Sequence, residues 1–309
     1  MKNKRLLIGI IAILLVIIAA IGGYKAITFA MDKYHYLRNI ADSLERYNEE
    51  NIQHYDFDYS WISDKKLVAH AFGGKGSKTY TNALEAFEYN YELGHRVFEV
   101  DFDLTDDGVC ICSHDEDYWR YITDNENSGV EYTYENFKNT PLFTDYTPMD
   151  YKDVIDLLIK YPDIYIITDT KYADELSVYR QFSQIVDYAK EKDPEVLDRL
   201  IPQIYTEDML GYVMNVHEFK SIDFTLYQIQ WDKEEIAKFC GRSGVRFLTV
   251  SDELIEDDMI DLWKSMGIKI AVHTVDEEDR ANELLDKGVD MIYTNYLEPE
   301  SQENGESNE

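Results

Sequence analysis

The stretch that decides the fold runs from Leu67 to Asp115 and contains LVAHAFGG at 67–74, VFEVDFDL at 97–104 and VCICSHD at 109–115. Two short apolar runs, 67–71 and 97–102, flank residues 81–96, whose apolar side chains recur at helical spacing. A strand, a helix and a second strand in this order form the repeating unit of a parallel sheet. We therefore expect an α/β fold and look for further copies of the unit.

Polar side chains stand where these apolar runs end. His70 follows the first run, His114 follows 109–113, and Glu99 and Asp101 lie two residues apart in the second run. On a strand this spacing places both carboxylates on one face, with Cα atoms roughly 6–7 Å apart. Hard divalent cations bind carboxylate oxygens and histidine transfers protons near neutrality, so the pattern indicates metal-assisted acid–base chemistry. The alternative is a solvated strand face with two loop histidines.

Beyond residue 146, strand-like and helix-like runs alternate. The strand-like runs are 164–168, 200–205, 224–228, 245–249, 268–273 and 291–294. With the first two runs they make eight strands, which predicts a (β/α)8 TIM barrel. A doubly wound open sheet is the alternative, but no glycine-rich dinucleotide fingerprint follows the first strand.

In such barrels the functional groups lie at the carboxyl ends of the strands. Asp169 and Lys171 follow the third strand, and His273 ends the seventh. Taken alone, Asp169 and Lys171 are typical of an ordinary ion pair, and His273 either lines a pocket or lies at the barrel rim. Trp231 follows the fifth strand and either stacks on a substrate or has a structural role.

Five motifs occur together in order and spacing: His70 at a strand end, Asn82 before a helix, Glu99-Val100-Asp101, Thr105-Asp106-Asp107-Gly108, and His114-Asp115. In these motifs the chain resembles the glycerophosphodiester phosphodiesterase family, within the phospholipase C-like phosphodiesterase superfamily. The resemblance covers residues 67–297. One departure is Ala71, which stands where the family usually has an arginine that contacts phosphate.

The resemblance implies a metal-dependent phosphodiester hydrolase acting on a glycerophosphodiester or a related phospholipid or glycerophosphate polymer. The implied roles are acid–base catalysis by His70 and His114, one divalent cation (Ca²⁺ or Mg²⁺) on Glu99, Asp101 and Asp169, and substrate binding by Lys171, Trp231 and His273. Two alternatives stay open. One is a membrane-anchored, non-catalytic binder of phosphorylated lipid or surface polymer, which Ala71 favours and the paired histidines oppose. The other is a lyase acting on choline-containing phospholipids.

The N-terminal region predicts a membrane anchor. Residues 6–23 form an uninterrupted apolar run after three basic residues in 1–5. At about 18 residues the run is long enough to span a bilayer, with 1–5 cytoplasmic and the catalytic domain outside the cytoplasm. We therefore expect a single-pass protein of the cell membrane; a cleaved signal peptide is the alternative. Residues 24–65 form a helical juxtamembrane stalk, 66–297 the barrel with an insertion at 116–146, and 298–309 a disordered acidic tail.

Composition restricts the partners. The formal net charge is −31, and a polyanion would be repelled by such a chain, so we expect no nucleic-acid partner. An anionic phosphodiester meets the same repulsion, which a bound cation and a local lysine would offset. The three cysteines are an odd number, which argues against a disulfide framework and favours buried thiols.

Overall fold

The computed structural model describes residues 53–126, 128–226 and 232–299. Within these ranges no helix has the length and apolar character needed to cross a membrane. The apolar run at 6–23, the stalk up to residue 52, Trp231 and residues 300–309 of the tail lie outside the described residues. What the sequence predicts for them stays a prediction.

Eight parallel strands close into a barrel. The strands are β1 (Leu67–Ala69), β2 (Val97–Leu104), β4 (Tyr165–Asp169), β5 (Leu200–Ile204), β6 (Asp223–Thr225), β7 (Phe247–Ser251), β8 (Lys269–His273) and β9 (Met291–Thr294). Closure comes from β1, which pairs with β9 through Val68 and Tyr293 and with β2 through Ala69 and Phe98. The predicted (β/α)8 barrel is confirmed. The alternative, an open sheet, is wrong because β1 pairs with a neighbour on each side and so closes the sheet on itself.

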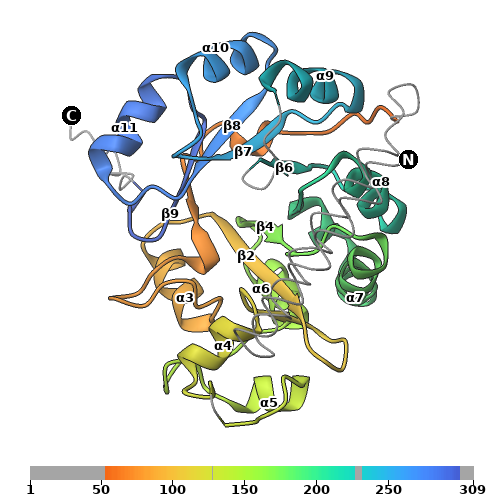
Figure 1. Ribbon diagram of the computed structural model, residues 1–309, viewed down its shortest axis with the longest axis vertical. Coiled ribbons are helices and arrows are strands. Elements are labelled where there is room, and N and C mark those ends of the chain that lie inside the picture. The colour runs from red at the N-terminus through yellow and green to blue at the C-terminus, as the bar shows by residue number, and fades with distance from the viewer. Residues whose placement is uncertain (1–52, 127, 227–231, 300–309) are drawn as a thin grey trace, which may run out of the picture. The chain divides into compact units, whose positions relative to one another are not determined.

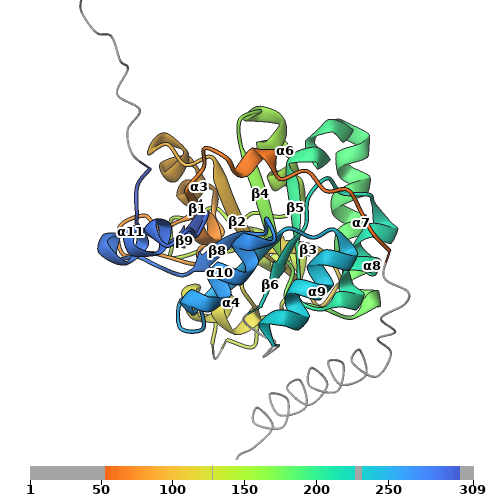
Figure 2. The same cartoon turned by 90° about the horizontal axis from the view of Figure 1, so that it is seen from above.

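Helices surround the strands (Figures 1 and 2). They are α3 (Leu84–Glu92), α6 (Tyr151–Lys160), α7 (Glu175–Lys192), α8 (Glu207–Val216), α9 (Lys233–Ser243), α10 (Asp257–Ser265) and α11 (Glu278–Asp286), with short 3-10 turns η3 (His70–Phe72) and η4 (Pro194–Arg199). Their apolar faces and the outward side chains of the strands form the larger hydrophobic core. This layer fixes the strands that carry the site.

The inside of the barrel is apolar at one end only. Val68, Val97, Ile167 and Phe247 lie in a buried inner cluster near the start of their strands. Trp61, from the 3-10 turn η2 (Ser60–Ile62), packs on this cluster. The amino-terminal end of the barrel is therefore filled with side chains, and polar groups are left to the other end.

The end of the predicted stalk packs on the barrel. Trp61 donates a hydrogen bond from Nε1 to Ser221 Oγ over 3.0 Å, and its ring lies 5.2 Å from the ring of Tyr165. The backbone N–H of Tyr55 also donates to the carbonyl of Ser243. Residues 53–65 therefore belong structurally to the barrel.

The insertion, residues 116–146, forms a small layer beside the barrel. It contains α4 (Glu116–Ile122) and α5 (Tyr134–Asn139), seen together in the lower part of Figure 1. It follows β3 (Cys110–Cys112), which pairs antiparallel with the end of β2. Trp119, Tyr132 and Phe137 lie in a hydrophobic cluster that also contains Ala83 and Ile111 from outside the insertion.

The thiols of Cys110, Cys112 and Cys240 are all free and buried, as the sequence predicted.

Candidate active site

The inward face of β2 changes from apolar to acidic along the strand. Val97, Glu99 and Asp101 share this face because side chains alternate along a strand. Asp169 at the end of β4 lies beside Asp101 in the parallel register. The three carboxylates each offer an oxygen within 4.8 Å of the others, and all three are buried. The predicted acidic triad is therefore assembled in the structure.

Neighbouring groups hold the carboxylates in place. The backbone N–H of Ala71 donates to Glu99 Oε2 over 2.7 Å. Asn82 donates from Nδ2 to Asp101 Oδ2 over 2.8 Å and accepts from the Asp101 backbone N–H over 2.9 Å. Ala71 and Asn82 both have left-handed backbones, with φ of 49° and 50°, which turns their polar groups toward β2. The two ends of the 70–82 segment thus orient two of the acids, Glu99 and Asp101.

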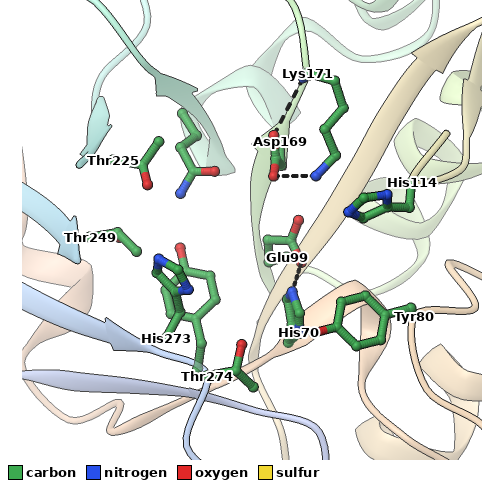
Figure 3. Close-up of a pocket in the computed structure, with 12 residues that line it drawn as sticks. His70, Tyr80, Glu99, His114, Asp169, Lys171, Thr225, Thr249, His273 and Thr274 are labelled. Atoms are coloured by element: carbon green, nitrogen blue, oxygen red, sulfur yellow. Dashed lines mark hydrogen bonds and ion pairs between the residues drawn. The ribbon is translucent and has the colours of Figure 1, made fainter. Parts of the chain in front are cut away.

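Lys171 lies between two of the acids. Its Nζ is 2.5 Å from Asp101 Oδ1 and 2.6 Å from Asp169 Oδ2. Figure 3 shows the contact with Asp169. Burial disfavours the ammonium, but the attraction of Asp101 and Asp169 outweighs it and raises the pKa of Lys171. The lysine keeps its charge, so the site holds three carboxylates against one cation.

The excess of negative charge in the site acts on the pKa of Glu99. Burial, and then repulsion by Asp101 and Asp169, raise the pKa of Glu99 well above its usual range. Burial acts the same way on Asp101, but the nearby Lys171 reverses the effect and lowers the pKa of Asp101 to about 2. A buried carboxylate without a counter-charge is costly.

The donor set fits a hard divalent cation. Carboxylate oxygens from three residues converge in a buried place where negative charge exceeds positive charge, which is the environment that Mg²⁺ and Ca²⁺ occupy in proteins. Glu99, Asp101 and Asp169 would hold such an ion. The same oxygen donors would suit a soft metal poorly.

His70 is positioned by the last strand. Its Nδ1 lies 3.2 Å from Asn295 Oδ1. Asn295 Nδ2 donates to Asp276 Oδ2 over 2.9 Å, so its oxygen must face His70 and Nδ1 must carry the hydrogen. Nε2 is then the nitrogen with a free electron pair, and it lies 3.9 Å from Glu99 Oε2. Burial lowers the pKa of His70, which keeps this imidazole neutral.

His114 has the opposite character. Its Nδ1 lies 2.7 Å from Asp115 Oδ2, and this hydrogen bond raises the pKa of His114. Asp115 is itself fixed, because its Oδ1 accepts the backbone N–H of Tyr118 as the N-cap of α4. One imidazole near the acids thus favours the neutral form and the other the charged form.

A pocket of about 170 Å³ joins these groups. His70, His114, Lys171 and Asp169 line one wall, and His273 stands on the opposite wall (Figure 3). Of the two interpretations of His273, the structure supports the pocket position. Burial lowers the pKa of His273 to about 4.

The sequence from residue 73 to residue 298 matches the model of the glycerophosphoryl diester phosphodiesterase family. The chain belongs to this family. The predicted relationship is therefore confirmed, and the protein is a phosphoric diester hydrolase of the glycerophosphoryl diester phosphodiesterase family. Among curated proteins, none matches this sequence.

Solved structures of glycerophosphodiester phosphodiesterases share the fold. An enzyme from Thermotoga maritima is 20% identical, with a TM-score of 0.57 over 75% of this chain and 94% of the other. One from Parabacteroides distasonis is 19% identical, with a TM-score of 0.61 over 75% and 93%. A phosphodiesterase from Oleispira antarctica, solved with the product sn-glycerol-3-phosphate, is 17% identical, with a TM-score of 0.61 over 75% and 93%.

Some residues of the phosphodiesterase pocket were not predicted from the sequence as site residues. They are Tyr80, Gln203, Thr225, Thr249, Thr274 and Tyr293. Most stand at the ends of strands, which is the signal that identifies them once the barrel is assumed. Tyr80 stands in a loop, where no periodic pattern points to it.

A buried carboxylate lies beneath this pocket. Asp223 Oδ2 accepts hydrogen bonds from Gln203 Nε2 over 2.8 Å, from Thr249 Oγ1 over 2.7 Å and from Tyr293 OH over 3.2 Å. Burial raises the pKa of Asp223 to about 7. The carboxyl group ties together side chains of β5, β7 and β9 and so sets the polar floor of the pocket.

Proposed function

We propose that this phosphodiesterase hydrolyses a glycerophosphodiester, with His70 as the general base and His114 as the general acid. The observation that carries the proposal is that two imidazoles with oppositely shifted pKa values face one pocket beside three buried carboxylates. A base must be neutral and an acid protonated at the same pH, and these environments favour that combination.

In the first step one proton moves from the substrate to His70 and another moves from His114 to the leaving group. Nε2 of His70 takes the proton of a substrate hydroxyl as its oxygen attacks phosphorus, and His114 gives a proton to the leaving alkoxide. The product is a cyclic phosphate and a free alcohol. In the second step neutral His114 takes a proton from a water molecule as the water oxygen attacks phosphorus. The ring P–O bond of the cyclic phosphate breaks, and charged His70 gives its proton to the oxygen that leaves. Both histidines end as they began.

Charge stabilisation supports the same assignment. A divalent cation, when bound by Glu99, Asp101 and Asp169, would neutralise charge on the phosphoryl oxygens. Lys171 lies within the same group of carboxylates and adds a positive charge that stays through the reaction. In a chain of net charge −31, such local positive charge is what an anionic substrate requires.

The substrate class rests on the relatives. The Oleispira antarctica phosphodiesterase was solved with sn-glycerol-3-phosphate as its product. A pocket of about 170 Å³ with a polar floor of threonine, glutamine and tyrosine side chains suits a small hydroxylated phosphate ester of this kind. We therefore assign a glycerophosphodiester as the substrate of this chain.

The test is release of glycerol phosphate from glycerophosphocholine by the full chain, with Mg²⁺, with Ca²⁺ and with EDTA. We expect turnover with at least one of the two cations, loss of activity in EDTA, and recovery of activity when the metal is added back. His70→Ala and His114→Ala should each lower the rate by about 10²- to 10⁴-fold without unfolding the protein. Phosphorus NMR should show the cyclic phosphate as a transient species; its accumulation would make the protein a lyase.

A wild-type protein that binds the diester but releases no product with either cation would contradict the proposal and identify a non-catalytic binder. Near-normal turnover by His70→Ala would contradict the assignment of the base.

A further inference from the structure

Tyr80 packs against both histidines. Its ring centroid lies 4.6 Å from that of His70, with the planes at 80°, and 6.1 Å from that of His114, with the planes at 75°. The ring forms part of the pocket wall, and Figure 3 shows it beside His70 on the side where His114 enters. A single aromatic side chain therefore contacts both of the imidazoles to which the acid and base roles are assigned.

Tyr80 is held in a backbone conformation that a tyrosine rarely adopts. Its φ is 56°, in the left-handed region, which is costly for a residue other than glycine and persists only when surrounding contacts fix it. Such a cost is typical of a side chain that must point in one particular direction. Here that direction is toward the imidazoles.

The insertion supplies several of the contacts that hold Tyr80, and the Tyr80 hydroxyl also hydrogen-bonds to Thr274. Tyr118 donates from its hydroxyl to the carbonyl of Thr79 over 2.8 Å, and its ring lies 6.3 Å from that of Tyr80. Lys78 Nζ lies 2.6 Å from Asp145 Oδ1 and 4.3 Å from the ring centroid of Tyr146. Lys78 and Thr79, the two residues before Tyr80, are thus bound to residues 116–146.

We propose that Tyr80 is a positioning residue that fixes the relative orientation of His70 and His114, and that the insertion serves to hold Tyr80 in place. The ring packs on both imidazoles and so restricts the rotation of each. Misplacement of a reacting group by about 1 Å costs on the order of 10²-fold in rate, so this contact acts on turnover. The inference rests on the proposed acid–base roles of the two histidines.

The test compares Tyr80→Phe, Tyr80→Ala and wild type by kcat and KM on glycerophosphocholine. Tyr80→Ala should lower kcat by about 10- to 100-fold while KM changes by less than about threefold, because the ring orients groups that act in the transition state. Tyr80→Phe keeps the ring and should retain kcat within about threefold. Tyr179→Ala, at an exposed tyrosine on α7, is the matched control and should behave as wild type.

The variant Lys78→Met tests the role of the insertion, because it removes the ion pair between Lys78 and Asp145. It should lower kcat by roughly 3- to 10-fold with an unchanged melting temperature, and its effect should largely disappear in the Tyr80→Ala background. Wild-type kcat in a folded Tyr80→Ala variant would overturn the inference, as would an equal loss in Tyr80→Phe. If Tyr80→Ala does not fold, an unchanged kcat in Lys78→Met overturns it. An inactive wild type would instead refute the proposed function.

Discussion

Asn82 and Asp101 exchange two hydrogen bonds, one between the side chains over 2.8 Å and one from the Asp101 backbone N–H to Asn82 Oδ1 over 2.9 Å. The asparagine comes from the loop before α3 and the aspartate from the middle of β2. This pair fixes the rotation of the Asp101 carboxylate, and thereby the oxygen that faces Lys171 and the other acids.

Replacing Asn82 with alanine should weaken cation binding. Asp101 would lose the donor that orients it, and outer-shell partners of metal ligands are worth about 10- to 100-fold in metal affinity. The measurement is the Mg²⁺ or Ca²⁺ concentration that gives half-maximal activity. Asn139→Ala, at an exposed asparagine of α5, is the control. An unchanged half-maximal concentration would show that Asp101 needs no such support.

Replacing Lys171 with methionine should destabilise the metal-free protein. The buried carboxylates of Asp101 and Asp169 would lose their counter-charge, and breaking a buried ion pair costs about 3–5 kcal/mol. The melting temperature in EDTA should fall by about 10 °C. Excess Mg²⁺ or Ca²⁺ should restore more of it than in wild type, because the ion replaces the missing charge. The exposed Lys238→Met variant is the control; equal metal effects in both would argue against a cation at this site.

Replacing Asp115 with asparagine should move the alkaline limb of the pH–rate profile. This limb reports loss of the proton from the general acid. The hydrogen bond to Asp115 raises the pKa of His114, so removing the carboxylate charge lowers that pKa and shifts the limb to lower pH. The acidic limb, which reports His70, should stay in place. Asparagine still caps α4, so stability should change little. A shift of the acidic limb alone would indicate that His114 is the general base and His70 the general acid.

Replacing Asp223 with asparagine should alter how stability depends on pH. The pKa of Asp223 is about 7 in the folded protein and near 3.8 in the unfolded chain. Between about pH 4 and 7 the unfolded chain loses this proton first, so the wild-type free energy of unfolding falls relative to Asp223→Asn by up to about 4 kcal/mol. Below pH 4 and above pH 7 the difference should be constant. Urea titrations across pH measure it, with the exposed Asp261→Asn as control. Parallel curves would refute a buried ionisable carboxyl.

Much of the fold follows from short-range patterns in the sequence. Alternation of apolar runs with helical segments predicts parallel strands, and a parallel connection has a preferred hand, so eight units have few arrangements besides a barrel. Because catalytic groups collect at one end of such a barrel, Glu99, Asp101, Asp169, His70 and His114 could be placed at the same end of the barrel from their positions in the sequence. These features depend on local spacing and on general rules of chain geometry.

Contacts between distant loops could not be predicted in this way. The sequence by itself predicted the barrel from its periodicity, and the acidic triad and the two histidines from motifs that resemble a known family, since periodicity and motif spacing are local properties of the chain. Only the tertiary structure placed Lys171 between two acids, fixed the tautomer of His70 through Asn295, and turned Tyr80 toward both imidazoles. Those relationships arise where the barrel closes and where left-handed backbone turns point side chains inward. Both depend on segments up to 225 residues apart meeting in space, and no local pattern encodes that meeting.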